Sequence, residues 1–465
     1  MSAKPTPSNL ALLTDLYELT MAQAYFECGM RAPATFSLFI RSYPQHRAYF
    51  VSAGLEDVLA YLETLHFTQD DLDYLSATAI FSDEFLHFLA GVRFTGDVWA
   101  IPEGRIFFRD EPVIEVTAPI IEAQMVETYI INQVNLQSIV ATKASRCVFA
   151  GRGRSLVDFS LRRTQGVDAG MKVARASYLA GFVSTSNVLA GKEYGIPVAG
   201  TMAHSFISSF EDELDAFRAF AQTFPERSIL LVDTYDTVEG ARKAAIVGQE
   251  MAQQGQRLQG VRLDSGDMAE LSKEVRKVLD EAGLKESSIF ASGSLDEFEL
   301  ESLINRGAKI DAFGVGTKMG VSADAPWSDI AYKLVRYDGR PVLKLSSGKV
   351  SLPGEKQVWR HADVKGRPSH DVIGLRSERP DAGEPLLQPV MKDGKMISEQ
   401  PTLKQLQEAF AEEFGKLPDR YKTLRDPPTY PVEVSSRLQK LYDQIELEHL
   451  RAGEGAAQGA GPDRG

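Results

Sequence analysis

The sequence predicts an α/β protein whose residues 151–330 form a (β/α) barrel. Short apolar runs typical of strands alternate there with helical stretches, and this order predicts parallel strands joined by crossover helices. The series holds about seven such units and lacks the paired glycine-rich turn of dinucleotide-binding sheets, which favours a barrel over an open doubly wound sheet. Polar residues also follow each strand, as expected where the carboxyl ends of barrel strands meet around one site.

The elements of this series have bounds that follow from their apolar patterns. Strands are expected at 155–160, 182–185, 196–200, 229–233, 258–263, 289–292 and 310–315. Helices are clearest at 168–180, 204–222, 237–254, 267–282 and 295–306.

The segments before the barrel combine helices with short strands. Helical apolar spacing covers residues 11–26, and residues 54–90 continue helical. Residues 94–119 alternate as short strands broken by Pro-Glu-Gly and Asp-Glu-Pro turns. A long helix is expected to follow at about 120–147.

The segments after the barrel begin with antiparallel strands. These are expected from residue 330 to about 360, with Asp338-Gly339 and Ser347-Gly348 as turns. Amphipathic helices are expected near 402–415 and 434–450. The expected parts of the chain are an N-terminal domain with a linking helix at 1–150, the barrel at 151–330, C-terminal strands and helices at 331–450 that pack back on the N-terminal domain, and a disordered tail at 451–465.

The composition excludes several classes of protein. The 51 Lys and Arg residues against 64 Asp and Glu give a net charge of −13, which argues against a general binder of nucleic acid or anionic membranes. Cys28 and Cys147 are too few for a disulfide framework or a cysteine-based zinc site. No run reaches the roughly 18–20 apolar residues of a membrane helix, and the first residues do not resemble a signal peptide. We expect a cytoplasmic protein whose partners are small molecules.

Two glycine-containing loops at late strand ends predict a phosphate site. Ser292-Gly293-Ser294 and the run Gly314–Thr317 each precede a helix or turn. Glycines there let backbone N–H groups approach an anion, and late barrel loops are the usual phosphate site of this architecture. Tight turns that require glycine are the alternative explanation.

Arginines near strand ends predict further anion contacts. Arg262 lies inside an apolar strand and points to the face opposite Val261 and Leu263. A charged group there needs an anionic partner, which is either Asp264 or Asp233 of the chain or a substrate carboxylate, the alternative that we favour. Of the adjacent Arg162 and Arg163, one is expected to bind phosphate.

Four carboxylates follow two neighbouring strands. Asp236 and Asp267 are well placed to cap the next helices. Asp233 and Asp264 are assigned to the pocket, where a magnesium ion would be held largely through water and a phosphorylated substrate. Asp233, acting through water, is the candidate for this contact.

His204 lies among small and apolar residues just after Gly200-Thr201. No second histidine or cysteine lies nearby in the sequence, so a histidine-rich metal site is not expected. A helix N-terminus lowers the pKa of an imidazole and favours added negative charge, which suits a nucleophile that accepts a phosphoryl group. A packed or capping imidazole is the structural alternative.

Six segments together resemble the nicotinate phosphoribosyltransferases over about residues 10–350. They are "LLTDLYELTMAQAYF", "LRRTQGVDAG", "GFVSTSNVLAGKEYGIPVAGTMAHSF", "GVRLDSGD", "ASGSLDE" and "FGVGTKMG". The resemblance implies an irregular (β/α) barrel with an N-terminal α/β sandwich domain and a C-terminal extension of strands and helices. It also implies a homodimer and the transfer of a phosphoribosyl group from phosphoribosyl pyrophosphate to nicotinate, with coupled ATP hydrolysis.

The resemblance further implies roles for individual residues. Tyr17, from the neighbouring subunit, would stack on the pyridine ring, and Thr201, Arg262 and Ser186 would contact nicotinate. His204 would be phosphorylated transiently by ATP, and Asp264 and Arg262 would take part in catalysis with Mg²⁺. The implied contacts of phosphoribosyl pyrophosphate are Thr317, Gly316, Gly314, Gly293, Ser294, Arg162 and Lys143.

Other readings compete with this one. A nicotinamide-using relative would carry an acid near Ser186, and a quinolinate-using relative would be shorter and more basic in its pocket. A barrel isomerase or aldolase would need Lys318 or Asp264 as its reactive group, and a non-catalytic protein would bind phosphate without turnover. The chain departs from the family at Ser160, where relatives often have glycine, and it lacks the C-terminal cysteine cluster of some members.

Overall fold

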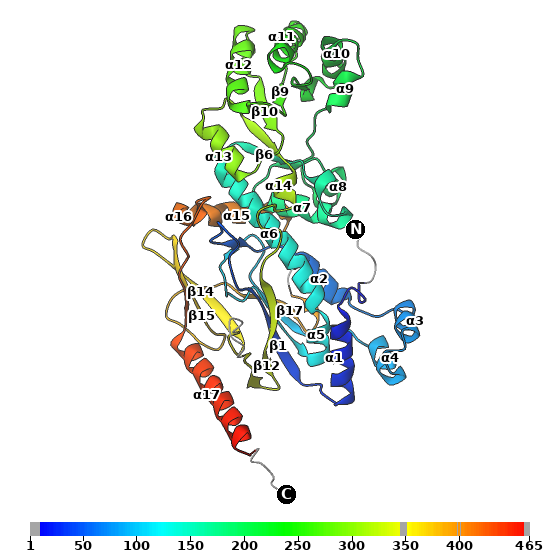
Figure 1. The fold of residues 1–465 in the computed structure, drawn as a ribbon, viewed down its shortest axis with the longest axis vertical. Coiled ribbons are helices and arrows are strands. Elements are labelled where there is room, and N and C mark those ends of the chain that lie inside the picture. Colours follow the sequence, from blue (N-terminus) through cyan, green and yellow to red (C-terminus); the bar gives the residue numbers. More distant parts are fainter. Residues whose placement is uncertain (1–9, 345–350, 398, 400, 460–465) are drawn as a thin grey trace. The chain divides into compact units, whose positions relative to one another are not determined.

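The computed structural model describes residues 10–344, 351–397, 399 and 401–459. The chain forms two compact units (Figure 1). The first comprises Met1–Ser138, Trp327–Thr402 and Glu412–Gly465, and the second comprises Ile139–Pro326 and Leu403–Ala411. The first unit is therefore built from both ends of the chain, and the second from its middle and one short C-terminal segment.

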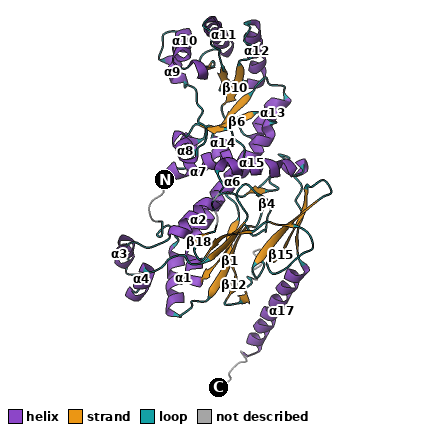
Figure 2. Cartoon of the chain, turned by 180° about the vertical axis from the view of Figure 1, so that it is seen from behind, coloured by secondary structure: helices purple, strands orange, loops and turns teal. Residues whose placement is uncertain are grey.

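A seven-stranded antiparallel sheet organises the first unit (Figure 2). In spatial order its strands are β13 (Arg340–Pro341), β12 (Ile330–Tyr337), β1 (Pro33–Ile40), β5 (Ile114–Pro119), β3 (Asp97–Ala100), β17 (Gln388–Lys392) and β18 (Lys395–Met396). The Asp338-Gly339 turn between β12 and β13 is confirmed, and both of its residues have positive φ. The Ser347-Gly348 turn lies outside the described residues.

Strand β1, which pairs with both β12 and β5, is absent from the sequence predictions. Every residue of β1 after Pro33 is buried. A strand covered on both faces loses the alternation of apolar and polar residues that indicates a strand in sequence. Its polar side chains have partners on β5, because Thr35 Oγ1 lies 2.9 Å from Thr117 Oγ1 and Ser37 donates to Glu115.

The helices of the first unit confirm the expected helical segments but divide them differently. They are α1 (Leu16–Glu27), α2 (Leu55–Thr64), α3 (Gln69–Ala77), α4 (Asp83–Ala90), α5 (Ile120–Met125) and α6 (Glu127–Gly151), the last of which continues into the second unit. Residues 54–90 form three helices because two N-caps interrupt them. Thr68 forms a capping box with Asp71, and Ser82 accepts a hydrogen bond from the backbone N–H of Phe85.

The rest of the first unit comprises two smaller sheets and C-terminal helices. One sheet has the order β16 (Glu384–Pro385), β14 (Lys356–Ala362), β15 (Pro368–Leu375) and β19 (Val432–Val434), and the other pairs β2 (Phe50–Val51) with β4 (Ile106–Phe107). The helices are α15 (Leu403–Lys416), which begins in the second unit, α16 (Asp419–Lys422) and α17 (Ser436–Gly459). Helix α17 continues past residue 450, where the sequence predicts a disordered tail, and residues 460–465 lie outside the described residues.

The second unit contains a six-stranded parallel sheet. In spatial order its strands are β7 (Ser184–Thr185), β6 (Ser155–Asp158), β11 (Ala312–Val315), β10 (Ser288–Ser292), β9 (Gly260–Leu263) and β8 (Ile229–Leu231). The first of these strands along the chain, β6, thus pairs with the last, β11. The strand expected at 196–200 was wrong, because only Val198 makes a bridge, to Thr185. Pro197 has no N–H with which to extend the pairing.

Helices connect the parallel strands of this unit (Figure 2). They are η1 (Leu161–Arg163), α7 (Val167–Leu179), α8 (Val188–Tyr194), α9 (His204–Ser208), α10 (Glu213–Thr223), η2 (Pro225–Arg227), α11 (Thr237–Gln253), α12 (Met268–Glu281), α13 (Glu297–Asn305) and α14 (Thr317–Gly320). The single helix expected at 204–222 is two helices, α9 and α10. Asp212 starts the second by accepting a hydrogen bond from the N–H of Leu214, at 2.9 Å.

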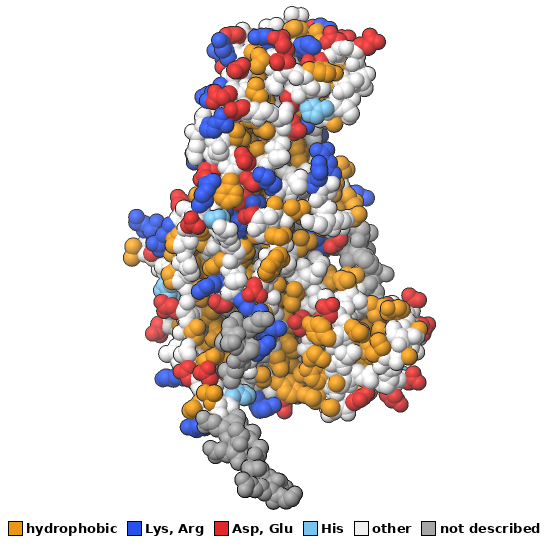
Figure 3. Space-filling view, viewed as in Figure 1, with side chains coloured by type: hydrophobic (Ala, Val, Ile, Leu, Met, Phe, Trp, Pro, Cys, Tyr) orange, Lys and Arg blue, Asp and Glu red, His pale blue; other side chains and the backbone are white. Residues whose placement is uncertain are grey.

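The surface carries charges of both signs. On the face drawn in Figure 3, lysine and arginine side chains lie among aspartates and glutamates. Within the described ranges, no helix combines the length and the apolar character needed to cross a membrane.

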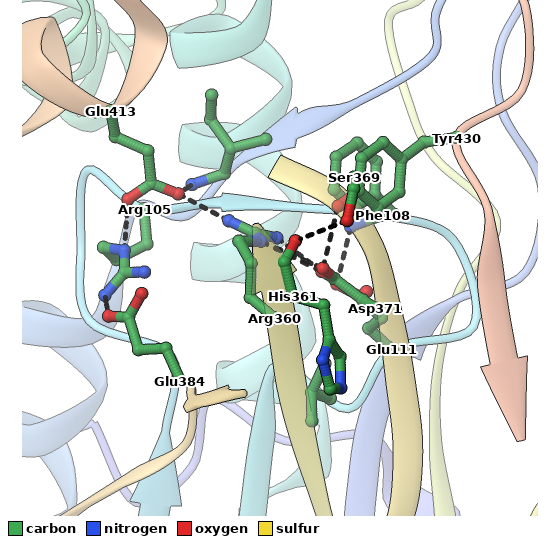
Figure 4. Close-up of polar contacts among 12 residues, drawn as sticks. Arg105, Phe108, Glu111, Arg360, His361, Ser369, Asp371, Glu384, Glu413 and Tyr430 are labelled. Atoms are coloured by element: carbon green, nitrogen blue, oxygen red, sulfur yellow. Dashed lines mark hydrogen bonds and ion pairs between the residues drawn. The ribbon is translucent and has the colours of Figure 1, made fainter. Parts of the chain in front are cut away.

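A buried ionic cluster joins strands β14 and β15 of the first unit to α15 (Figure 4). Arg360 is directly opposite Asp371 in the strand register and lies 2.6 Å from it, and also 2.6 Å from Glu413. Tyr430 donates a hydrogen bond to Asp371 at 3.0 Å. Burial, and then the charge of Asp371, raise the pKa of Glu111 well above its ordinary value. Arg360 is therefore the cation paired with Asp371, whereas Glu413 is shared between Arg360 and Arg105.

A second buried carboxyl group lies on α1. Glu18 is fully buried and accepts hydrogen bonds from the side chains of Thr14 and Thr128 and from the N–H of Thr128. Burial raises the pKa of Glu18 to about 7, although these hydrogen bonds act in the opposite direction.

Replacement of Glu18 by glutamine is expected to remove a pH dependence of stability. A carboxyl whose pKa is higher in the folded state binds more protons when folded, so its contribution is lost as pH rises through about 7. Relative to Glu18→Gln, the wild-type free energy of unfolding should fall by as much as about 3 kcal/mol between about pH 4 and pH 8. Urea unfolding followed by tryptophan fluorescence measures this, because Trp99, Trp327 and Trp359 all lie in the first unit.

The matched control is Glu27→Gln, which changes an exposed carboxyl on the same helix. Its difference from the wild type should not vary with pH over this range. Parallel pH curves for the wild type and Glu18→Gln would contradict the prediction.

Candidate functional site

The carboxyl ends of three neighbouring parallel strands, β8, β9 and β10, supply a cluster of polar side chains in the second unit. Neighbouring parallel strands end at the same edge of a sheet, which is where α/β proteins place their sites. The residues joined there by polar contacts are Thr201, His204, Asp233, Thr234, Arg262, Asp264, Ser265 and Ser292.

His204 is the first residue of α9 and its side chain is 44% exposed, so it is not a packed core imidazole. It does not cap the helix either, because the N-cap residue is Ala203. Its Nδ1 lies 3.1 Å from Thr234 Oγ1, and its Nε2 lies 3.9 Å from Asp264 Oδ2. The ring therefore stands between a hydroxyl and a carboxylate: Nδ1 is within hydrogen-bond distance of Thr234, and Nε2 has Asp264 at 3.9 Å and no closer polar contact in the described part of the chain.

Arg262 presents a guanidinium without a close carboxylate among the described residues. Its Nη1 donates to the hydroxyl of Thr201 and, at 3.1 Å, to the carbonyl of Met202. The carboxylate of Asp264 lies 3.9 Å away, which is too long for a hydrogen bond, and the buried Nε has no partner in the described part of the chain. Burial lowers the pKa of Arg262, while the charges of Asp264 and Asp233 oppose this. This largely buried guanidinium therefore has only a long ion pair, with Asp264, among the described residues, and it can still accept a closer anion.

Asp233 and Asp264 are held by different partners. Asp233 Oδ2 accepts from the N–H of Asp264 at 3.0 Å and from the hydroxyl of Ser265 at 2.6 Å, so it fixes the loop after β9. Its Oδ1 is buried and has no partner among the described residues. Asp264 Oδ1 accepts from Ser292, which leaves Oδ2 toward His204.

The predicted helix-capping aspartates are confirmed. Asp236 accepts from the N–H groups of Val238 and Glu239 and caps α11. Asp267 caps α12 in the same way and also pairs with Arg306 at 2.6 Å. Both side chains are thereby engaged in local structure.

The glycines of the two predicted phosphate loops have structural reasons. Gly293 has a φ of +100°, and a Cβ there would lie 2.1 Å from the carbonyl oxygen of Asp264. A Cβ on Gly314 would lie 2.6 Å from the Phe159 ring, and one on Gly316 would lie 3.0 Å from the Phe159 carbonyl. Close packing thus explains these glycines without a ligand. Ser294 and Thr317, the polar residues of the two loops that were predicted to contact phosphate, are exposed, whereas Ser292 is buried.

Two predicted anion contacts of the second unit differ in their surroundings. Arg162 is exposed in η1, and its charge acts to lower the pKa of Arg262, so the two guanidiniums are neighbours. Lys143 is 1% exposed on α6, and its amine pairs with Glu297 at 2.5 Å and Asp324 at 2.7 Å. The amine of Lys143 is therefore enclosed and paired with two carboxylates, and its contact with pyrophosphate stays a prediction.

The remaining predicted residues have these positions. Ser186 follows β7, is partly buried, and donates its backbone N–H to the Asp158 carbonyl at 2.8 Å. Tyr17 belongs to the first unit, where it is 46% exposed on α1. Burial of the hydroxyl, and then the charge of Glu127, raise the pKa of Tyr17, which hydrogen-bonds to Glu127. Lys318, the candidate lysine of an aldolase, lies 3.1 Å from Asp296.

Sequence reasoning did not assign Thr234 or Ser265 to the site. Each directly follows an aspartate that it did assign, at the end of β8 and β9 respectively. Their position after a strand end was the available signal, but threonine and serine are common in turns and stand out less than charged residues.

Carboxylates that could contact a metal ion are sparse at this site. Within the described residues, no group of three or more His, Cys, Asp or Glu side chains is arranged to hold a metal ion. Mg²⁺ commonly uses one or two carboxylates together with water and substrate phosphates, and Asp233 and Asp264 meet that smaller requirement.

Family models match three segments of the chain. The nicotinate phosphoribosyltransferase N-terminal domain matches residues 12–135, the nicotinate phosphoribosyltransferase family matches residues 154–349, and the corresponding C-terminal domain matches residues 382–442.

Individual proteins are similar over nearly the whole chain. A nicotinate phosphoribosyltransferase of Mycobacterium tuberculosis is 50% identical over 430 residues, covering 92% of each chain. The nicotinate phosphoribosyltransferase of Bacillus subtilis is 37% identical over 473 residues, covering 94% of this chain and 96% of its own. The crystal structure of human nicotinic acid phosphoribosyltransferase superposes with a TM-score of 0.82 at 29% identity, covering 93% of this chain and 99% of its own.

Proposed function

Because the chain belongs to the nicotinate phosphoribosyltransferase family, we propose that it joins nicotinate to the phosphoribosyl group of phosphoribosyl pyrophosphate. The products are nicotinate mononucleotide and pyrophosphate, and the reaction serves the salvage of nicotinate into NAD. The names of the relatives from Mycobacterium tuberculosis, Bacillus subtilis and human support this activity. We further propose that ATP hydrolysis is coupled to the transfer.

The state of Arg262 is the observation that carries the proposal. Its guanidinium is largely buried at the end of β9 and lacks a close carboxylate among the described residues. The carboxylate of nicotinate supplies the missing anion, and a planar fork of N–H groups matches a carboxylate better than an amide. Thr201, which accepts a hydrogen bond from Arg262, and Ser186, in place of the acid expected of nicotinamide-using relatives, complete this specificity.

The chemistry requires stabilisation of two opposite charges. As the bond from ribose C1 to pyrophosphate breaks, positive charge develops on the ribose and negative charge on the leaving group, while the pyridine nitrogen attacks C1. We assign the phosphate contacts to Arg162, Gly293, Ser294, Gly314, Gly316 and Thr317. Mg²⁺, held by Asp264 and Asp233 through water, would neutralise the leaving group. Tyr17 of a neighbouring subunit in a homodimer would stack on the pyridine ring and hold it in line with C1.

His204 is the proposed phosphoryl acceptor from ATP. Its exposure, its position at the start of α9 and the freedom of Nε2 from a close contact support this role. A phosphoryl group there adds negative charge next to Arg262 and Asp264, which can bias loop positions and thereby couple ATP turnover to substrate binding.

The parallel sheet is inferred to be the wall of an irregular (β/α) barrel. Pairing of the first strand, β6, with the last, β11, is what closure of such a sheet requires, and it supports this inference. The strand ends that carry the site residues would then surround its mouth.

One assay tests the proposed function. The protein is incubated with phosphoribosyl pyrophosphate and Mg²⁺, with either nicotinate or nicotinamide and with or without ATP, and mononucleotide and pyrophosphate are measured. We expect nicotinate mononucleotide, a strong preference for nicotinate, and stimulation by ATP. Preference for nicotinamide, or no product, would overturn the activity.

The variant His204→Ala separates the two parts of the proposal. It should lose stimulation by ATP while slow transfer without ATP remains. Complete loss of transfer without ATP would contradict the role assigned to His204.

A further inference from the structure

Thr234 is held rigidly next to the candidate phosphoryl acceptor. It lies in the loop between β8 and α11, and both of its flanks are fixed. On one side Asp233 accepts hydrogen bonds from the loop after β9, and on the other Asp236 caps α11. The N–H of Val232 also donates to the Arg262 carbonyl at 3.1 Å. A hydroxyl on such a loop can orient a neighbour with little loss of its own freedom.

The hydroxyl of Thr234 contacts one of the two ring nitrogens of His204. Its Oγ1 lies 3.1 Å from Nδ1, within hydrogen-bond distance. The other nitrogen, Nε2, lies 3.9 Å from Asp264 Oδ2, beyond hydrogen-bond distance. Ser292 holds Asp264 through its other oxygen. Of the two polar neighbours of the ring, Thr234 is therefore the one within hydrogen-bond distance of a ring nitrogen, and its hydroxyl can either accept from Nδ1–H or donate to Nδ1.

The tautomer decides whether His204 can act as a nucleophile. A neutral imidazole carries its proton on one nitrogen and a lone pair on the other. If Nδ1–H donates to Thr234, the lone pair is on Nε2, whose polar neighbour among the described residues, Asp264, is 3.9 Å away. With the proton on Nε2 instead, the lone pair at Nδ1 would be covered by the threonine hydroxyl, and no nitrogen would be free to attack phosphorus.

We propose that Thr234 is a positioning residue for His204, accepting a hydrogen bond from Nδ1–H and so presenting the Nε2 lone pair to the terminal phosphoryl group of ATP. This inference rests on the proposed coupling to ATP. In the transfer step the bond from Nε2 to phosphorus forms as the bond from phosphorus to the bridging oxygen breaks. ADP leaves with that electron pair, and the Nδ1 proton stays on the ring, hydrogen-bonded to Thr234.

The variants Thr234→Val and Thr234→Ser test the hydroxyl directly. Valine keeps the shape of the side chain and removes the acceptor, whereas serine keeps the acceptor. We expect Thr234→Val to slow transfer of labelled phosphate from ATP to the enzyme roughly 2- to 13-fold, as loss of one neutral hydrogen bond implies. Thr234→Ser should restore most of this rate, and the label should be on Nε2 by NMR of the phosphorylated protein.

A second readout separates loss of positioning from a folding defect. The ratio of ATP-stimulated to ATP-independent transfer should fall in Thr234→Val by the factor seen for labelling, whereas a folding defect would lower both together. The matched control is Thr223→Val, an exposed threonine near the end of α10, which should leave labelling and the ratio unchanged.

The outcomes distinguish this inference from the proposed function. Normal labelling and a normal ratio in Thr234→Val, with both lost in His204→Ala, would overturn the role of Thr234 alone. Phosphate on Nδ1 would do the same. Labelling and ATP stimulation that persist in His204→Ala would overturn the assignment of His204 as phosphoryl acceptor, and the role of Thr234 with it.

Discussion

Replacement of Arg262 by leucine is expected to raise the KM for nicotinate roughly 10- to 150-fold, which corresponds to the ~1.5–3 kcal/mol of a hydrogen bond to a charged group. Leucine removes the only positive charge that the proposal places on the nicotinate carboxylate. The KM for phosphoribosyl pyrophosphate should change little, because its phosphates are assigned to other loops. Steady-state kinetics with each substrate varied in turn measure both quantities.

The preference between nicotinate and nicotinamide should fall by a similar factor in Arg262→Leu. The two substrates differ in charge at the group that Arg262 is proposed to bind, so removing the guanidinium removes most of the discrimination. Arg257→Leu is the matched control, because it removes an exposed arginine that precedes the same strand. A KM effect confined to phosphoribosyl pyrophosphate would assign Arg262 to phosphate instead and contradict the prediction.

The features that sequence reasoning predicted correctly depend on neighbours in the chain. Asp236 and Asp267 cap helices that begin at the next residue, so the pattern of one aspartate before an amphipathic helix was sufficient. Most parallel strands were found for a related reason, because each is a short apolar run between helices.

The features that sequence reasoning missed depend on residues far apart in the chain. The amine of Lys143 is neutralised by Glu297 and Asp324, which no local pattern around residue 143 reveals. The contact of His204 with Thr234 likewise joins two residues that are 30 positions apart and lie on either side of strand β8 in the sequence. Strand β1 was missed because both of its faces are covered, which removes the alternation that marks a strand. Pairings of this kind are set by tertiary packing rather than by local propensity.

Replacement of Arg360 by methionine is expected to lower the free energy of unfolding of the first unit by ~3–5 kcal/mol at neutral pH, the usual cost of removing one partner from a buried ion pair. Methionine fills a similar volume but leaves the fully buried Asp371 without its cation, whereas Glu413 keeps its ion pair with Arg105. Glu111 nearby is a buried carboxyl whose pKa is raised by burial and by Asp371, and it supplies no positive charge in place of Arg360. Urea unfolding followed by tryptophan fluorescence reports this unit, because it contains all three tryptophans.

Two further measurements identify why Arg360→Met lowers the free energy of unfolding: the pH dependence of the loss and the effect of a neighbouring variant. Carboxyl groups left without Arg360 will have higher pKa values in the folded state, so the destabilisation should shrink as pH falls and protonation removes their charge. Arg367→Met removes a half-exposed arginine that pairs with Asp363 at the turn of the same hairpin, and it should cost no more than ~1 kcal/mol. Equal losses in the two variants would show that the hairpin needs arginine side chains for packing alone. A loss in Arg360→Met that does not vary with pH would place its origin outside the carboxyl cluster.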